Sequence, residues 1–226
     1  MTLLRWLLLC AALPATAPAA TVTMPVESGG AFGVRVHSIK ELRFRNTVRQ
    51  QFDFSCGSAA VATLLSSQYG YMVGEQAVFK EMFEHGDPAK IKAQGFSMLD
   101  MKRYLDAHGF HGDGFITTTD KLAAAGLPAI VLVRDNGYNH FVVLKGVKNE
   151  RVLLGDPSRG TRAVSRAAFE TLWINRLALV AREHRDQVAF NRDSDWRAAP
   201  AAPLELGLNR DAFAATLMML KGGTDF

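Results

Sequence analysis

The spacing of apolar residues changes once along the chain, near Gly126, and this change limits the fold more than any other feature. Before Gly126, apolar residues recur at helical spacing in segments that end at glycines, which favours helices. After it, short runs rich in Val and Leu are separated by turn sequences such as DNGYN and KNE, which favours strands. Helices followed by an antiparallel meander are typical of an α+β domain with a helical lobe and a sheet lobe. The expected helices are 56–68, 74–86, 97–109, 118–126 and 165–173, and the expected strands are 127–134, 140–147, 151–157 and 176–182.

The first 20 residues have the organisation of a secretory signal peptide. Arg5 provides the positive start, residues 6–13 are apolar, and small residues at 17–20 offer a cleavage site. The apolar run is too short to cross a bilayer. We therefore expect residues 1–20 to be removed on export and the protein to be periplasmic. The alternative is an N-terminal helix that stays on the protein.

The rest of the chain is long enough for one domain with a sizeable core. Residues 21–45 are predicted as an extended or hairpin-like lead-in, because AFGVRV alternates apolar and polar residues and LRFRNTV at 42–48 alternates again. Residues 46–182 are predicted as the domain. The composition then turns polar and includes RAAPAAP, which predicts a linker and tail at 183–226.

Charge and composition argue against several partners and cofactors. The formal net charge is +4, and no Lys/Arg cluster is interleaved with aromatic residues, so we expect no nucleic-acid partner. Beyond residue 20, no apolar run approaches the length of a membrane helix, so no transmembrane segment is expected in the mature chain. His108, His111 and Asp113 carry metal-ligating atoms but have no further obvious ligand nearby. We predict neither a metal nor another cofactor.

Cys56 is the only cysteine left once the signal peptide, with Cys10, is removed. A buried structural cysteine is the simplest explanation. However, Cys56 stands where a polar loop meets the start of an apolar predicted helix. A free thiol has a pKa near 8.5 and is a weak nucleophile at neutral pH. A helix N-terminus and a neighbouring histidine both favour the reactive thiolate. This position therefore indicates a candidate nucleophile.

The partners that such a nucleophile needs are found on the predicted strands. Among the histidines, only His140 begins an apolar strand directly after a turn. A hairpin centred on 148–150 folds Asp156 back beside it, where a carboxylate fixes the imidazole tautomer and stabilises the cation. The side-chain amide of Gln50 or Gln51, in the loop before Cys56, would suit an oxyanion donor.

These residues resemble a known family. The pattern Q-x5-CG-x-A, followed downstream by HFVV and by D-P sixteen residues after the histidine, is similar to the C39 peptidases, which have a papain-like fold. The resemblance covers roughly residues 46–181. It selects Gln50 over Gln51 as the oxyanion donor, and it implies that Cys56, His140 and Asp156 are catalytic.

Members of the C39 family process bacteriocin-type leaders after a double glycine, mostly as cytosolic domains of ABC exporters. This chain has no P-loop and carries the predicted signal peptide, so its layout is more similar to the stand-alone, periplasmic C39-like form of functional-amyloid (Fap) operons in Gram-negative bacteria. The resemblance implies a periplasmic cysteine endopeptidase acting on a secreted or leader-bearing polypeptide, with outer-membrane secretion components as possible partners.

Two other functions remain open. One is a catalytically silent module of the same fold that binds and escorts a secreted subunit. The other is acyl-transfer or amidase chemistry on the same residues. The tail also carries Gly222-Gly223 after an apolar stretch. This suggests either a helix that ends at a glycine or a segment that folds back into the cleft as an inhibitor or is cleaved by the protein itself.

Overall fold

The computed structural model describes the backbone at residues 20–25 and 31–200, and the side chains from His37 to Pro200. The chain divides into two compact units, at Met1–Ile39 and Lys40–Phe226. In the first unit, β1 (Ala20–Pro25) and β2 (Ala31–Val36) form an antiparallel pair with Ala20 opposite Val36. Gly222 and Gly223, on which the tail hypothesis depends, lie outside the described residues, as does most of the predicted signal peptide.

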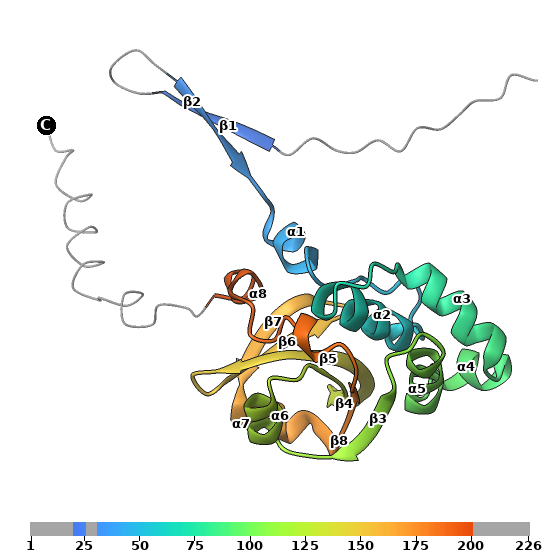
Figure 1. Cartoon of the computed structure of the whole chain (residues 1–226). Coiled ribbons are helices and arrows are strands. Elements are labelled where there is room, and N and C mark those ends of the chain that lie inside the picture. The colour runs from blue at the N-terminus through green and yellow to red at the C-terminus, as the bar shows by residue number, and fades with distance from the viewer. Residues whose placement is uncertain (1–19, 26–30, 201–226) are drawn as a thin grey trace, which may run out of the picture. The chain divides into compact units, whose positions relative to one another are not determined.

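A six-stranded antiparallel sheet forms the centre of the second unit (Figure 1). Its strand order is β3-β8-β4-β5-β6-β7. The strands from β4 to β6 form the predicted meander, which β7 continues, and the last strand returns to lie beside β4. The sheet and the helices before it confirm the α+β fold class. The strands are β3 (Gly112–Ile116), β4 (Ala129–Asp135), β5 (Tyr138–Lys148), β6 (Arg151–Asp156), β7 (Gly160–Ser165) and β8 (Trp173–Ala181).

The helices confirm the predicted helical segments and add shorter ones. The expected segment 56–68 is an α-helix that continues into a π-helical turn, η1 (Leu64–Gln68). Short helices at both ends of the unit were not expected. The helices are α1 (Ile39–Phe44), α2 (Cys56–Thr63), α3 (Glu75–His85), α4 (Pro88–Gln94), α5 (Met98–Ala107), α6 (Thr119–Ala125), α7 (Arg166–Leu172), the 3₁₀ turn η2 (Arg185–Gln187) and α8 (Asp193–Arg197).

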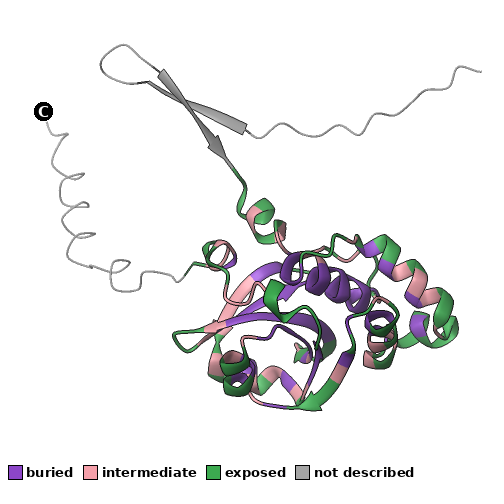
Figure 2. Ribbon diagram, viewed as in Figure 1, coloured by how far each residue is buried: buried purple, intermediate pink, exposed green. Residues whose placement is uncertain are grey.

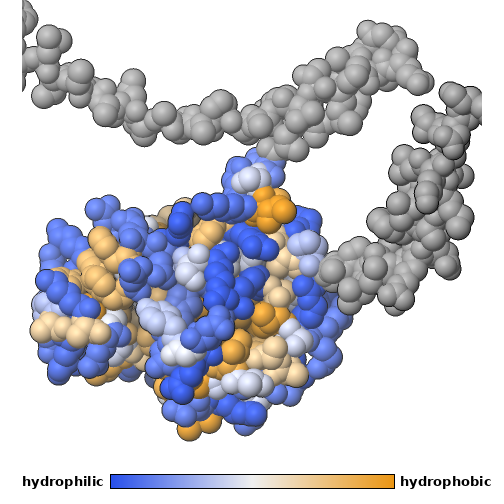
Figure 3. All heavy atoms as spheres, turned by 180° about the vertical axis from the view of Figure 1, so that it is seen from behind, coloured by the Kyte–Doolittle hydropathy of each residue, from blue (hydrophilic) through white to orange (hydrophobic). Residues whose placement is uncertain are grey.

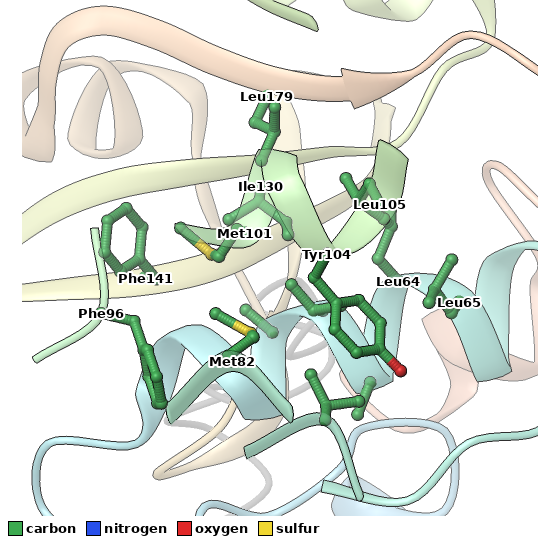
Figure 4. Packing of buried hydrophobic residues seen from close by; sticks show 14 of the residues in the cluster. Leu64, Leu65, Met82, Phe96, Met101, Tyr104, Leu105, Ile130, Phe141 and Leu179 are labelled. Atoms are coloured by element: carbon green, nitrogen blue, oxygen red, sulfur yellow. The ribbon is translucent and has the colours of Figure 1, made fainter. Parts of the chain in front are cut away.

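Two hydrophobic cores lie on opposite faces of the sheet. Along β5, Phe141 and Val143 pack with the first core, while Val142 and Leu144 pack with the second. This is the alternation expected of a strand buried on both faces. The first core lies between the sheet and the long helices, where Met82, Met101 and Ile130 meet (Figure 4). The second core is closed by residues of α6 and α7.

Helix α2 runs through the first core and is buried along its whole length (Figure 2). Its sequence CGSAAVAT contains only small residues, so neighbouring elements approach it on all sides. The Ser66 and Ser67 hydroxyls donate to the carbonyls of Ala62 and Thr63, at 2.5 and 2.8 Å, where the helix widens into η1. Such back-bonding from serine often accompanies distortion of a helix.

The extended structure expected at 42–48 is wrong, because α1 occupies Ile39–Phe44. Alternation over a few residues does not exclude a short helix, and no described strand pairs with this segment. Two strands were missed because their sequences, GDGFI and GTRAVS, lack a β-branched run. Helix α4 was missed although Asp87 caps it by accepting from the N–H groups of Ala89 and Lys90.

The segment predicted as a linker after residue 182 packs on the domain up to α8. The Ala189 N–H donates to the carbonyl of Gln68, and the Asn191 N–H donates to that of Lys145, both at 2.9 Å. Asp195 forms an ion pair with Lys145 at 2.8 Å, and both side chains are buried. We call residues 186–199 the C-terminal strap.

Seen from behind relative to Figure 1, the described surface is mainly hydrophilic, with apolar patches between the hydrophilic residues (Figure 3). Within the described part of the chain, no helix has both the length and the apolar character that crossing a membrane would require.

Candidate active site

Cys56 is the first residue of α2 and is 6% exposed. The loop before it forms a tight turn, in which the Ser55 hydroxyl donates to the Phe52 carbonyl at 3.0 Å and receives the Phe52 N–H at 3.1 Å. The first N–H groups of a helix lack partners within the helix and carry partial positive charge. The thiol therefore lies where a negative charge is stabilised.

The loop before Cys56 is tied to the rest of the domain on two sides. The Val48 N–H donates to the Thr63 hydroxyl at 2.9 Å, at the far end of α2. The Gln50 N–H donates to the carbonyl of Pro157 at 3.1 Å, directly after β6. The loop thus holds the start of α2 against the end of the β6 strand.

His140 and Asp156 lie on neighbouring strands and are in hydrogen-bond contact. In β5 and β6, Val143 pairs with Gly155, which places Asp156 diagonally across from His140. The imidazole Nε2 lies 2.9 Å from Asp156 Oδ1. Because the carboxylate is an acceptor, Nε2 carries the proton and Nδ1 is the ring nitrogen left for the thiol. His140 is 7% exposed and Asp156 is 1% exposed.

Asp156 receives more hydrogen bonds than the sequence indicated. Its Oδ1 accepts from the Ser158 N–H at 2.9 Å, from the Ser158 hydroxyl at 2.7 Å and from the Arg159 N–H at 3.2 Å. Its Oδ2 accepts from Nε of Arg162 at 2.9 Å. These partners were not predicted from the sequence. The turn sequence Asp-Pro-Ser could have indicated the contact with Ser158, but nothing in the sequence pattern indicates the contact with Arg162 on β7.

The electrostatics of the site favour a charged imidazole and a charged carboxylate. Burial lowers the pKa of His140, but hydrogen bonds with Asp156 and Cys56 and the charges of both residues raise it, to about 9. Burial raises the pKa of Asp156, but the hydrogen bond and charge of His140, together with Ser158 and Arg162, hold it well below its usual range. These interactions favour the imidazolium form of His140 at neutral pH.

Gln50 and Gln51 differ in their positions. The Gln50 amide Nε2 donates to the carbonyls of Phe52 and Asp53, at 3.0 and 3.4 Å, within the loop that ends at Cys56. Its Oε1 is buried and has no hydrogen-bond partner among the described residues. Gln51 is exposed and lines a cavity on the side facing α3. Of the two, Gln50 is the one tied to the turn after Asp156.

Tyr138 connects the sheet to the same loop. Its hydroxyl donates to the carbonyl of Asp53 at 3.0 Å, and its ring centroid lies 6.4 Å from that of His140. Burial, followed by the charges of Cys56 and Asp53, raises the pKa of Tyr138. Phe52 and Phe54 stack at 5.8 Å on the other side of the loop. These three aromatic residues all lie on or against the loop before Cys56.

The structure separates the three residues weighed as a metal site. Nε2 of His108 lies 3.5 Å from Glu81, Nδ1 of His111 lies 3.5 Å from Glu183, and Asp113 pairs with Arg182. Among the residues with described side chains, no group of three or more His, Cys, Asp or Glu residues is arranged to hold a metal ion.

A sequence profile described as the Peptidase C39 family matches residues 45–185. The chain belongs to the peptidase C39 family. The matched region includes Gln50, Cys56, His140 and Asp156 and ends before the C-terminal strap. The resemblance inferred from the cysteine and histidine motifs is thereby confirmed.

Two curated C39 relatives are named "Probable functional amyloid protease FapD". The protein from Pseudomonas aeruginosa is 43% identical over 159 residues, which are 70% of each chain. The protein from Pseudomonas fluorescens is 44% identical over 139 residues, which are 62% of each chain. The predicted likeness to the functional-amyloid form is therefore also confirmed.

Solved C39 peptidase domains are similar at lower identity. One is a double glycine motif protease from an AMS/PCAT transporter in complex with the leader peptide, with a TM-score of 0.49, 23% identity, and coverage of 59% of this chain and 88% of that one. Another is the peptidase domain of Streptococcus ComA, with a TM-score of 0.49, 22% identity, and coverage of 60% and 97%.

Proposed function

We propose that this C39 protein is a cysteine endopeptidase in which Cys56 is the nucleophile, His140 the acid and base, and Asp156 the residue that orients His140. The observation that carries the proposal is the contact of His140 with Asp156 beside a cysteine at the start of a buried helix. A pure binding module has no need for this arrangement, which stabilises an imidazolium cation next to a thiol.

The acylation step follows from the positions of these groups. The Cys56 thiolate attacks the carbonyl carbon of the scissile peptide bond, and a C–S bond forms as the carbonyl oxygen becomes an oxyanion. The imidazolium of His140 gives its Nδ1 proton to the leaving amine, and the C–N bond breaks. The products of this step are the free amine and a thioester on Cys56.

Deacylation reverses the role of His140. The neutral imidazole takes a proton from water, and the hydroxide attacks the thioester carbonyl. The C–S bond breaks, the carboxylic acid leaves, and the thiolate–imidazolium pair is restored. The Asp156 carboxylate keeps the proton on Nε2 throughout, so that Nδ1 always faces the reaction.

The oxyanion needs hydrogen-bond donors, and we assign the Cys56 backbone N–H and the Gln50 side-chain amide to this role. The Cys56 N–H has no helical partner because it is at the first position of α2. Gln50 Nε2 donates to the Phe52 carbonyl at 3.0 Å and makes a long 3.4 Å bond to the Asp53 carbonyl, and this longer bond is easily exchanged for one to the oxyanion.

The proposed setting is the periplasm, and the proposed substrate is a secreted polypeptide of a functional-amyloid export system. The signal-peptide pattern at 1–20 supports export, and the functional-amyloid names of the Pseudomonas relatives support the substrate class. A secreted or amyloid subunit is the expected partner, together with outer-membrane secretion components.

The decisive experiment compares the secreted proteins of cells carrying wild type or Cys56→Ala by intact-mass analysis. A peptidase predicts that at least one secreted polypeptide keeps a higher mass in the variant. Lys121→Ala serves as a control, since it changes an exposed residue of α6 outside the proposed machinery. If the masses are the same in all strains while secretion is normal, the escort function is favoured and the peptidase proposal is wrong.

A further inference from the structure

A cavity of about 320 Å³ lies between α3 and the loop before Cys56. It is adjacent to the proposed active site but contains none of its catalytic groups. Most of its lining is apolar, with charged residues at the rim and one carboxylate below them. Its lining includes Phe52, Glu75, Phe79, Lys80, Phe83 and Glu84.

Glu75 is a carboxylate that the fold buries without completing its hydrogen bonds. It is 3% exposed, and its Oε1 accepts from the Ser58 hydroxyl at 3.0 Å. Its Oε2 is buried and has no hydrogen-bond partner within the described residues. Leaving a buried carboxylate oxygen unpaired is costly, and proteins rarely do so without a reason. A ligand that brings a hydrogen-bond donor would supply the missing partner.

The charges around the cavity leave Glu75 without a compensating cation. Glu75 is the first residue of α3, where the partial positive charge of the helix favours a carboxylate. Lys80 and Glu84 are exposed and lie 4.0 Å from each other, so they largely neutralise one another at the rim. The remaining charge of the cavity is negative, which favours a cationic ligand.

The aromatic walls also suit a cation with an aliphatic stem. The rings of Phe52 and Phe79 lie 5.2 Å apart, and those of Phe79 and Phe83 stack at 5.6 Å. Ring faces attract cations, and Lys92 already lies over the ring of Phe83 at 5.8 Å. Phe52 is 49% exposed, so a side chain arriving from solvent can reach its ring.

Two residues connect the cavity to the start of α2, where the Cys56 thiol lies. Ser58, which donates to Glu75, is on the first turn of α2 together with Cys56. Phe52 belongs to the tight turn that sets the start of the same helix. A side chain held in this cavity would therefore belong to a residue near the scissile bond.

We propose that this cavity is a specificity subsite that receives a lysine or arginine side chain of the polypeptide substrate. The aliphatic stem lies against the phenylalanine rings, and the cation binds the carboxylate of Glu75. This inference rests on the proposed peptidase function, because it assigns a substrate feature to the same active site.

The test uses the purified mature protein and a diverse mixture of synthetic peptides, with cleavage sites read by mass spectrometry on both sides of the broken bond. Lysine or arginine is expected to be enriched about 10-fold over leucine at one position relative to the cleavage site. Glu75→Gln keeps the size of the side chain and removes its charge, and it should abolish this enrichment while cleavage of the other peptides continues.

Two further variants keep the result interpretable. Glu183→Gln removes an exposed carboxylate outside the cavity lining and should leave the preference within about 2-fold of wild type. If Glu75→Gln fails to fold, Phe52→Leu is the substitute, and it should reduce the preference about 3-fold by removing an exposed ring. Cleavage without any preference for basic residues, or a preference that persists in Glu75→Gln, overturns the subsite.

A binding experiment distinguishes failure of the subsite from failure of the peptidase proposal. If wild type cleaves no peptide, the subsite is judged by binding of N-acetyl-lysine methylamide and its norleucine counterpart to the protein, followed by NMR. Tighter binding of the lysine compound that is lost in Glu75→Gln supports the cation site without the reaction. Equal binding of the two compounds overturns it.

Discussion

At the scale of single residues, the charge on His140 depends on two neighbours with different roles. Asp156 is buried, receives hydrogen bonds from Ser158 and Arg162, and stays ionised well into the acid range. Cys56 contributes a second hydrogen bond and a second charge. Both neighbours therefore favour the protonated form of His140.

These interactions predict the titration of His140. Its NMR signals should shift with a midpoint at about pH 9 in wild type. In Cys56→Ala the midpoint should fall, because the thiolate is removed, but it should stay above 6.5 because Asp156 remains. A wild-type midpoint near 6.5 would contradict the pairing of the three residues.

The same pKa shift predicts how stability depends on pH. The pKa of His140 is raised from 6.5 to about 9, so its contribution to stability is complete below pH 6.5 and is lost as the pH rises through 9. In urea unfolding, wild type should lose more stability between pH 6.5 and 9 than His140→Ala. Parallel pH profiles of the two proteins would argue against a folded-state imidazolium.

At the scale of elements, the position of Cys56 depends on close packing around α2. A Cβ added at Gly57 would lie 2.9 Å from the Cβ of Phe96, which is closer than side chains normally approach. The small residues of the helix are therefore needed for it to run through the core. The start of α2, and with it the thiol, is fixed by this packing and by the loop before it.

Gly57→Ala should accordingly destabilise the domain by about 1–3 kcal/mol, through overpacking against Phe96. Gly114→Ala is the matched control, since its added Cβ meets only the sulfur of Met98 at 3.9 Å and should change stability by less than about 0.5 kcal/mol. Urea unfolding of both variants measures the difference. Equal effects would show that the packing around α2 is looser than the structure indicates.

The helices and strands that were predicted correctly are those whose pattern of apolar residues matches their burial in the cores. The helix at 56–68 and the strand at 140–147 are buried in the cores, and their apolar runs were readable. Strands β3 and β7 owe their structure to pairing with β8 and β6, which local sequence does not encode. The His140–Asp156 contact was predictable because a single hairpin joins the two residues, whereas the Arg162 contact depends on the unpredicted β7.

At the scale of the whole molecule, the C-terminal strap ties together parts of the chain that form the site. Lys145 of β5 donates to the carbonyl of Asn46 at 2.8 Å and pairs with Asp195, while Asn46 donates to Asp195 at 2.6 Å. Arg192 donates to the carbonyl of Ser67 at the end of η1. The strap lies beyond the region matched by the C39 profile.

The buried ion pair makes the strap a stability determinant. Asp195→Ala should cost about 3–5 kcal/mol, because it leaves Lys145 charged and unpaired in the interior. The double variant Lys145→Met/Asp195→Leu should recover most of this loss. Glu84→Ala, which breaks an exposed pair with Lys80, should cost less than about 1 kcal/mol in the same urea titrations. A small effect of Asp195→Ala would mean that the strap is not held by this pair.

The proposed mechanism requires a thiolate at Cys56 that is stabilised by the adjacent imidazolium of His140. The most direct test is the rate at which iodoacetamide alkylates Cys56 at pH 6, followed by intact mass. We predict that wild type reacts at least about 10-fold faster than a free cysteine peptide, whose thiol is almost wholly protonated at this pH, and that His140→Ala loses the advantage. Alkylation of wild type no faster than the free peptide, or unchanged in His140→Ala, would contradict the proposed mechanism.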